Sequence, residues 1–195
     1  MPKSLRTFLE DCQKEIPSEI VRVAKQVDPA NLGCSAGGIL YWGRRYDKAL
    51  AESRTFLELY PSVSSLYGRM GSIYLLQGAH EQALEYLVKG AELSGHGNYE
   101  ESILGQAYGM CGRRSEAQQI LQALMAKSKD QYVGSVNIAR IYAGLGDRNR
   151  AFEYLDRAYR KYASEWPFHL VDPMWDSLRS DPRFVALLKR VGLKS

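Results

Sequence analysis

Four alanines recur at one constant spacing along this chain, at Ala49, Ala83, Ala117 and Ala151. Two other residue types keep the same step, at Tyr74, Tyr108 and Tyr142 and at Gly78, Gly112 and Gly146. A period of about 34 residues, built from two helical segments, is typical of a solenoid of helix-turn-helix units that stack on one another. The chain is therefore expected to be an array of near-identical helical hairpins.

The second unit shows the pattern most fully, with Tyr67-x-x-Met70-Gly71-x-x-Tyr74 followed by a turn glycine and an alanine. This pattern resembles the tetratricopeptide repeat family. The resemblance implies an all-α fold, a right-handed α-solenoid with helical caps at both ends. It also implies four units, expected at residues 30–63, 64–97, 98–131 and 132–165. The first unit is the weakest match, because Leu40 stands where the tyrosine is expected and Gly43 comes one place early.

The repeated small residues have a mechanical reason. Alanine or glycine at a helix crossing lets two antiparallel helices approach closely, so Gly71 and Gly105 on first helices and the four alanines on second helices are predicted to be contact points. The repeated glycines follow the last apolar residue of each first helix, where a left-handed C-terminal cap favours glycine. They are predicted to mark the turn inside each unit.

Composition narrows the function classes. The chain has 195 residues, of which 45% are hydrophobic and 25% charged, as in an ordinary soluble domain. No apolar run approaches the roughly 20 residues of a membrane helix, and no signal-type segment opens the chain, which favours a cytoplasmic protein without membrane contact. The net charge of +4 comes from scattered side chains, so a nucleic-acid partner is disfavoured.

No residue constellation points to catalysis. The three histidines, His80, His96 and His169, are isolated from one another and from partners that would make them bases. The three cysteines are odd in number and have no short spacing, so neither a disulfide framework nor a zinc site is indicated. The sequence therefore predicts no catalytic, metal or cofactor-binding residue and a chain that is not an enzyme.

The end of the chain breaks the period. The stretch from Trp166 to Leu178 contains two prolines, and Asp181-Pro182 then provides a helix start. Residues 166–195 are predicted to cap the fourth unit, with Trp166, Trp175 and Phe184 packed on it. This ending also resembles the tails of repeat regions attached to bacterial regulators.

The start of the chain, residues 1–29, also differs from the repeats. It resembles the start of prenylated-flavin-dependent decarboxylases of the ubiquinone-pathway type, and it carries none of that family's catalytic residues. Residues 19–25 fit a strand or a helix. A helix that caps the first unit is favoured, because no other segment reads as a partner strand. Docking on such a decarboxylase through residues 1–29 is the alternative that this resemblance suggests.

Side chains of the first helices that are not needed for packing are expected to line a concave groove. By register, the predicted groove residues are Asn31, Tyr41, Trp42, Ser72, Leu75, Leu76, Tyr99, Ser102, Gln106, Met110, Val136 and Arg140. Apolar and small polar side chains with a single charge suit a protein or peptide ligand with apolar anchors. The predicted function is thus a protein-binding scaffold. The alternatives are a groove filled by the N-terminus or by a second copy, the latter giving a homodimer.

Overall fold

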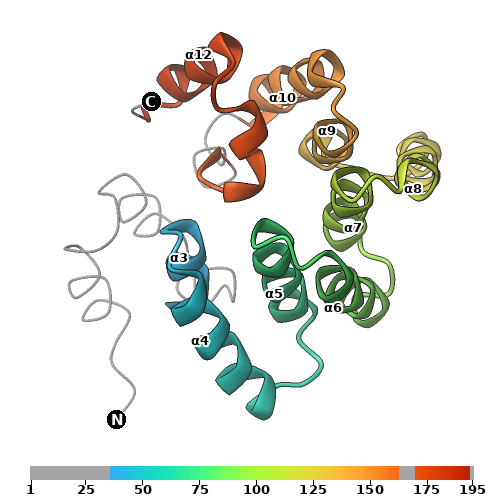
Figure 1. Cartoon of the computed structure of the whole chain (residues 1–195). Helices are drawn as coiled ribbons and strands as arrows, with labels where there is room; N and C mark the ends of the chain where they lie inside the picture. Colours follow the sequence, from blue (N-terminus) through green and yellow to red (C-terminus); the bar gives the residue numbers. More distant parts are fainter. Residues whose placement is uncertain (1–35, 163–169, 194–195) are drawn as a thin grey trace.

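The computed structural model describes residues 36–162 and 170–193 (Figure 1). These residues form helices and loops, without a strand among them. The predictions for residues 1–29, including the choice between helix and strand at 19–25, lie outside the described ranges, as do Asn31 and Trp166.

Eight α-helices pair in chain order into four antiparallel hairpins, as the repeat period predicts. The all-α solenoid is therefore confirmed. The hairpins consist of α3 (Ala36–Trp42) with α4 (Tyr46–Leu59), α5 (Ser64–Leu76) with α6 (His80–Leu93), α7 (Asn98–Met110) with α8 (Arg114–Lys127), and α9 (Ser135–Gly144) with α10 (Arg148–Tyr162). The chain then continues through a 3₁₀-helix, η2 (Pro173–Leu178), to α12 (Pro182–Arg190).

The repeated small residues lie at the helix contacts. All four period alanines are fully buried, with 0% of their surface exposed. A Cβ atom added at Gly71 would lie 2.5 Å from the Leu87 Cγ, and one added at Gly105 would lie 3.0 Å from Ile141. Neither site has room for a larger side chain without movement of its neighbours.

The predicted glycines lie in the turns inside the units. Gly78, Gly112 and Gly146 have φ values of 80°, 78° and 79°, which confirms the left-handed cap in units two to four. In the first unit the same register position is Arg44, which adopts φ 59° without being a glycine. The backbone thus keeps its period where the sequence has lost it.

The helices α7 and α9 approach each other unusually closely. A Cβ added at Gly109 would lie 2.5 Å from the backbone carbon of Gly144, and one added at Gly144 would overlap the backbone oxygen of Gln106. The corresponding positions of the second unit are Leu75 and Leu76. This glycine pair therefore departs from the period, and it brings together the first helices of the third and fourth units.

The final helix packs on the fourth unit. Arg190 donates to Asp156 on α10 at 2.8 Å and lies over the ring of Tyr159 at 4.0 Å. The helix begins as its sequence predicts, because the Asp181 carboxylate accepts a hydrogen bond from the Arg183 backbone nitrogen at 3.0 Å. Phe184, near the start of this helix, is fully buried.

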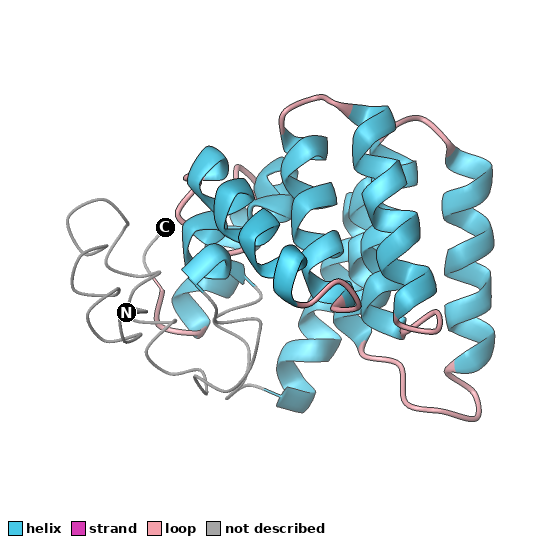
Figure 2. Cartoon of the chain, turned by 90° about the horizontal axis from the view of Figure 1, so that it is seen from below, coloured by secondary structure: helices cyan, strands magenta, loops and turns pink. Residues whose placement is uncertain are grey.

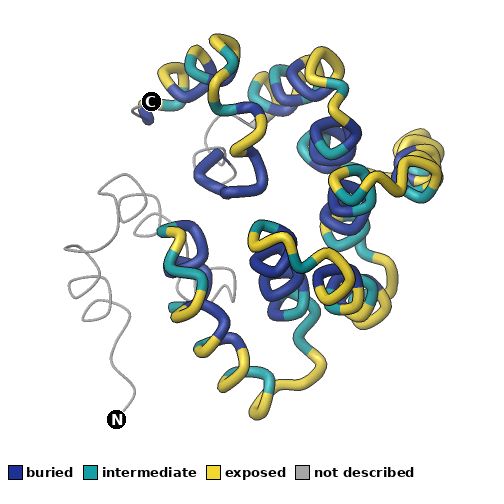
Figure 3. The backbone as a smooth tube through the Cα atoms, viewed as in Figure 1, coloured by how far each residue is buried: buried dark blue, intermediate teal, exposed yellow. Residues whose placement is uncertain are grey.

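The array curves around its own C-terminal segment. Figure 1 shows η2 on the inner side of the curve, and η2 contacts α5 and α9. Figure 2 shows the connecting loops at the two ends of the helices. In Figure 3 the inward sides of the helices and η2 itself are buried, while the exposed positions lie on the outside and at the loops. The position of η2 determines what the concave face can do.

Candidate functional site

The concave face holds a segment of the same chain, residues 170–178. Leu170 and Trp175 expose 0% of their surface, Leu178 exposes 1% and Met174 exposes 2%. Side chains buried to this extent behave as core, since each contributes about 1.5–3 kcal/mol by leaving water. The segment is thus an integral part of the fold.

A buried carboxylate anchors this segment. Asp172 Oδ2 lies 2.7 Å from Arg140 Nη2 on α9, and Asp172 Oδ1 accepts a hydrogen bond of 2.6 Å from the Tyr41 hydroxyl on α3. The same Oδ1 accepts from the Met174 backbone nitrogen at 3.0 Å, which caps the start of η2. One side chain therefore joins the first unit, the fourth unit and the C-terminal segment.

The surroundings keep Asp172 and Arg140 ionised. Burial on its own would raise the pKa of the Asp172 carboxyl, but the charge of Arg140 and the hydrogen bonds from Tyr41 and Met174 bring that pKa below its ordinary value. Burial and the adjacent carboxylate raise the pKa of the Tyr41 hydroxyl well above its usual value. The centre of the concave face thus holds a guanidinium, a carboxylate and a neutral phenol.

Polar and aromatic groups complete the contact. Gln106 Nε2 on α7 donates to the Met174 carbonyl at 2.8 Å. The Arg140 guanidinium lies 5.2 Å from the ring centre of Trp175 and 5.6 Å from that of Tyr99. A main-chain carbonyl, a carboxylate and an indole of the segment are therefore all bound by side chains from the first helices.

A second set of contacts closes the array. Arg44, after α3, binds Asp176 of η2 at 2.6 Å across 132 residues of sequence. Arg179 contacts the same carboxylate and donates to the carbonyls of Leu170 and Val171 at 3.1 and 3.2 Å. The first unit is thus tied to the residues that follow the fourth.

The predicted groove residues divide by burial. The buried ones are Tyr41, Trp42, Ser72, Leu75, Ser102, Gln106 and Arg140. Tyr99 and Met110 expose 43% and 41% of their surface, and Leu76 and Val136 are half-buried. Three of the buried ones bond residues 172–174 of the same chain. A role of these residues in binding a partner stays a prediction.

The sequence reasoning missed Asp172 as a site residue. Two signals could have found it: Asp172-Pro173 is a helix start after the period ends, and Arg140 is the single charge expected on the concave face. A buried guanidinium requires an acidic side chain close in space. The sequence does not indicate which acid this is, because Asp172 follows Arg140 by 32 residues and belongs to the C-terminal segment.

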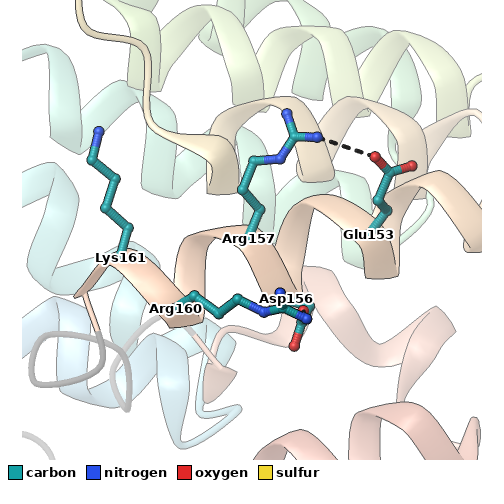
Figure 4. Close-up of a pocket in the computed structure, with 5 residues that line it drawn as sticks. All are labelled: Glu153, Asp156, Arg157, Arg160 and Lys161. Carbon is teal, nitrogen blue, oxygen red and sulfur yellow. Dashed lines mark hydrogen bonds and ion pairs between the residues drawn. The ribbon is translucent and has the colours of Figure 1, made fainter.

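A second group of charged side chains lines an open depression on α10 (Figure 4). Arg157 binds Glu153 at 3.2 Å, as the dashed line shows, and Arg160 binds Asp156 at 2.7 Å. All five lining residues come from one helix, the fifth being Lys161. Two acidic and three basic side chains line the depression, so it carries no strong charge of one sign that would select a ligand.

The family comparison agrees with this architecture. The model of the tetratricopeptide repeat matches residues 64–96 and 135–160, which contain α5 with α6 and α9 with most of α10. Two segments of the chain thus match the tetratricopeptide repeat. The two matched repeats are the second and fourth hairpins, and α7 with α8 lies between them in the same register. No curated protein matches the chain.

Within residues 36–162 and 170–193, no helix is long and apolar enough to cross a membrane. Nor do three or more His, Cys, Asp or Glu side chains gather there as a metal site would require.

Proposed function

We propose that the chain is a non-catalytic protein-interaction module that binds its partner along one edge of the array. Tetratricopeptide repeats generally mediate contacts between proteins, and two are present here. The observation that carries the choice of surface is a row of exposed apolar side chains beside the turns between units.

These turns lie on one edge, because alternate helices run antiparallel and every second helix ends at the same side. We call this surface the inter-unit edge, and define it as residues 58–63, 92–98, 126–134 and 160–161. Seven large apolar side chains are exposed in the part of the chain that the structure describes. Four of them lie on the inter-unit edge: Leu59 with 68% of its surface exposed, Tyr60 with 54%, Leu93 with 36% and Tyr132 with 61%. A row of this kind favours a protein contact.

The filled concave face supports the same choice. A peptide could enter its centre only by displacing residues 170–178, which would return Trp175 and Leu178 to water and leave Arg140 without Asp172. The free-energy cost of exposing each such apolar side chain is about 1.5–3 kcal/mol. A partner on the inter-unit edge avoids this cost.

Affinity capture with the full chain as bait tests the proposal. The wild type is compared with the double variant Leu59→Asp/Leu93→Asp, and the control is Gln82→Asp/Gln118→Asp, two exposed positions near the opposite ends of α6 and α8. We expect the wild type and the control to retain a specific partner and the edge variant to lose it. Equal capture by all three baits would contradict the choice of edge. Capture of neither another protein nor a second copy of the chain would contradict the function.

A second candidate uses the concave face itself. The contacts of Arg140, Tyr41 and Gln106 with residues 172–174 are those that an acidic peptide with an apolar anchor would make. Calorimetric titration of the chain with a synthetic peptide of residues 170–179 tests it. Binding would favour exchange of the segment for a partner peptide. Absence of heat would contradict peptide binding at the concave face.

A further inference from the structure

The inter-unit edge changes its charge along the array at one register position. The second helices of the first two units end in Glu58-Leu59 and Glu92-Leu93, two pairs that lie one period apart. The same two positions in the third and fourth units are Ala126-Lys127 and Arg160-Lys161. The edge is therefore acidic and apolar at one end of the array and basic at the other.

The charged groups of this pattern are accessible. Glu58 and Lys161 are exposed, and the side chains of Glu92 and Arg160 expose 55% and 77% of their surface. Lys127 is half-buried. Glu92 lies 3.6 Å from Lys89, and Arg160 lies 2.7 Å from Asp156, within their own helices. Such exposed pairs within one helix are worth about 0.3–0.5 kcal/mol, so they leave both groups able to meet a further charge.

Opposite charges at the two ends of a row make the row complementary to itself when it is reversed. In a two-fold dimer each surface meets the same surface running the other way. With the axis between the second and third units, Glu58 would face Arg160 of the second copy. Glu92 would face Ala126 and lie next to Lys127, the residue that follows it in the second copy. Symmetry forms each of these two contacts twice.

The apolar side chains fit the same arrangement. Leu59 and Leu93 share the register of Lys161 and Lys127, so in the reversed pairing each leucine would lie against a lysine of the second copy. Lysine can cover an apolar side chain with its aliphatic stem while its ammonium stays in water. Leu59, with 68% of its surface exposed, would gain most from this cover.

We propose that the chain forms a two-fold symmetric homodimer through the inter-unit edge, with the acidic first half of one copy against the basic second half of the other. This inference rests on the proposed function, since it names a second copy as the partner of the same surface. It differs from a dimer through the concave face, where residues 170–178 already lie.

Sedimentation equilibrium of the full chain at concentrations up to about 100 μM, where micromolar dimers are populated, tests the dimer. We expect the wild type to dimerise, and salt to weaken the dimer by screening. Glu58→Lys/Glu92→Lys and Lys127→Glu/Arg160→Glu should each raise the dissociation constant about tenfold or more, because like charges then face each other. Glu81→Lys/Glu85→Lys, on exposed positions of α6 nearer its start, makes the same change in net charge as Glu58→Lys/Glu92→Lys and should leave the dimer unchanged.

The decisive sample is an equimolar mixture of the two charge-reversed variants, whose reversed edges are complementary to each other. A one-to-one heterodimer in that mixture, with circular dichroism showing native helix content in both variants, would support the proposal. A monomeric wild type over the whole concentration range, or a mixture that stays monomeric, would overturn it. If the wild type is monomeric and still captures another protein through Leu59 and Leu93, the dimer fails and the proposed function stands.

Discussion

At the residue scale, the same chemical change is expected to have opposite effects at two glycines. Gly112 has φ 78° with nothing within 4 Å of its added Cβ, so Gly112→Ala strains only the backbone and should lower the free energy of unfolding by about 1–2 kcal/mol. Gly68 lies inside α5, where an added Cβ meets only Ile103 at 3.9 Å. Gly68→Ala should raise stability by up to about 1 kcal/mol through helix propensity. Urea denaturation measures both free-energy changes. If both variants gained or both lost stability, the different roles given to Gly112 and Gly68 would be contradicted.

Asp172 is expected to be among the most sensitive positions. Asp172→Asn keeps the size of the side chain but leaves the Arg140 guanidinium buried without its counter-charge. Loss of one partner of a buried ion pair costs about 3–5 kcal/mol. Asp172→Asn combined with Arg140→Met should cost less than the sum of the two single changes, and this coupling is measured in a double-mutant cycle by urea denaturation. Additive losses would show that the ion pair contributes nothing.

The lowered pKa of Asp172 gives stability a dependence on pH with a definite sign. A carboxyl whose pKa is lower in the folded state than in the unfolded chain stabilises the fold above the unfolded value of about 3.9. This contribution disappears as the pH falls below that value and through the folded pKa. The difference in unfolding free energy between wild type and Asp172→Asn should therefore shrink in acid, because protonated Asp172 is also neutral. A constant difference down to about pH 2 would contradict this.

At the element scale, the glycine pair between α7 and α9 should be intolerant of even one methyl group. Gly144→Ala would place its Cβ in overlap with the Gln106 backbone oxygen, and a backbone atom can move only with its helix. Overpacking of this kind typically costs about 1–3 kcal/mol. The shift of α9 would also move Arg140 away from Asp172. The loss should therefore exceed that of Gly71→Ala, where the closest atoms belong to the Leu87 side chain and the nearest backbone atom, the Ala83 oxygen, lies 2.9 Å away. Thermal unfolding of the two variants compares them.

The elements also show how far the sequence alone could predict this fold. The period, the buried alanines and the turn glycines are local or recur once per unit, so each unit reinforces the interpretation of the next. The Gly109 and Gly144 contact interrupts that period and was not foreseen, since each glycine looks unremarkable in its own unit. The path of η2 was missed for a similar reason. Asp172 and Tyr41 are separated by 131 residues, and no repeat signals their meeting.

At the whole-molecule scale, the closing contacts should make this array unfold differently from an open solenoid. In an open array each repeat touches only its neighbours, so the ends fray first. Here Tyr41 and Arg44 bind Asp172 and Asp176, so α3 shares the stability of the C-terminal segment. In the wild type, amides of α3 and α4 should therefore exchange with solvent hydrogen almost as slowly as those of α9 and α10.

Removal of these contacts should release the first unit alone. In Tyr41→Phe/Arg44→Ala, a buried hydrogen bond to a charged group, worth about 1.5–3 kcal/mol, and an exposed ion pair are lost. Hydrogen exchange in α3 and α4, followed by mass spectrometry, should become about ten to a hundred times faster, with α9 and α10 little affected. Arg113→Ala, which removes an exposed pair with Glu116 inside the third unit, is the control and should leave α3 protected. If exchange rises equally in all four hairpins, the first unit is held by its neighbours alone and closure contributes nothing to its stability.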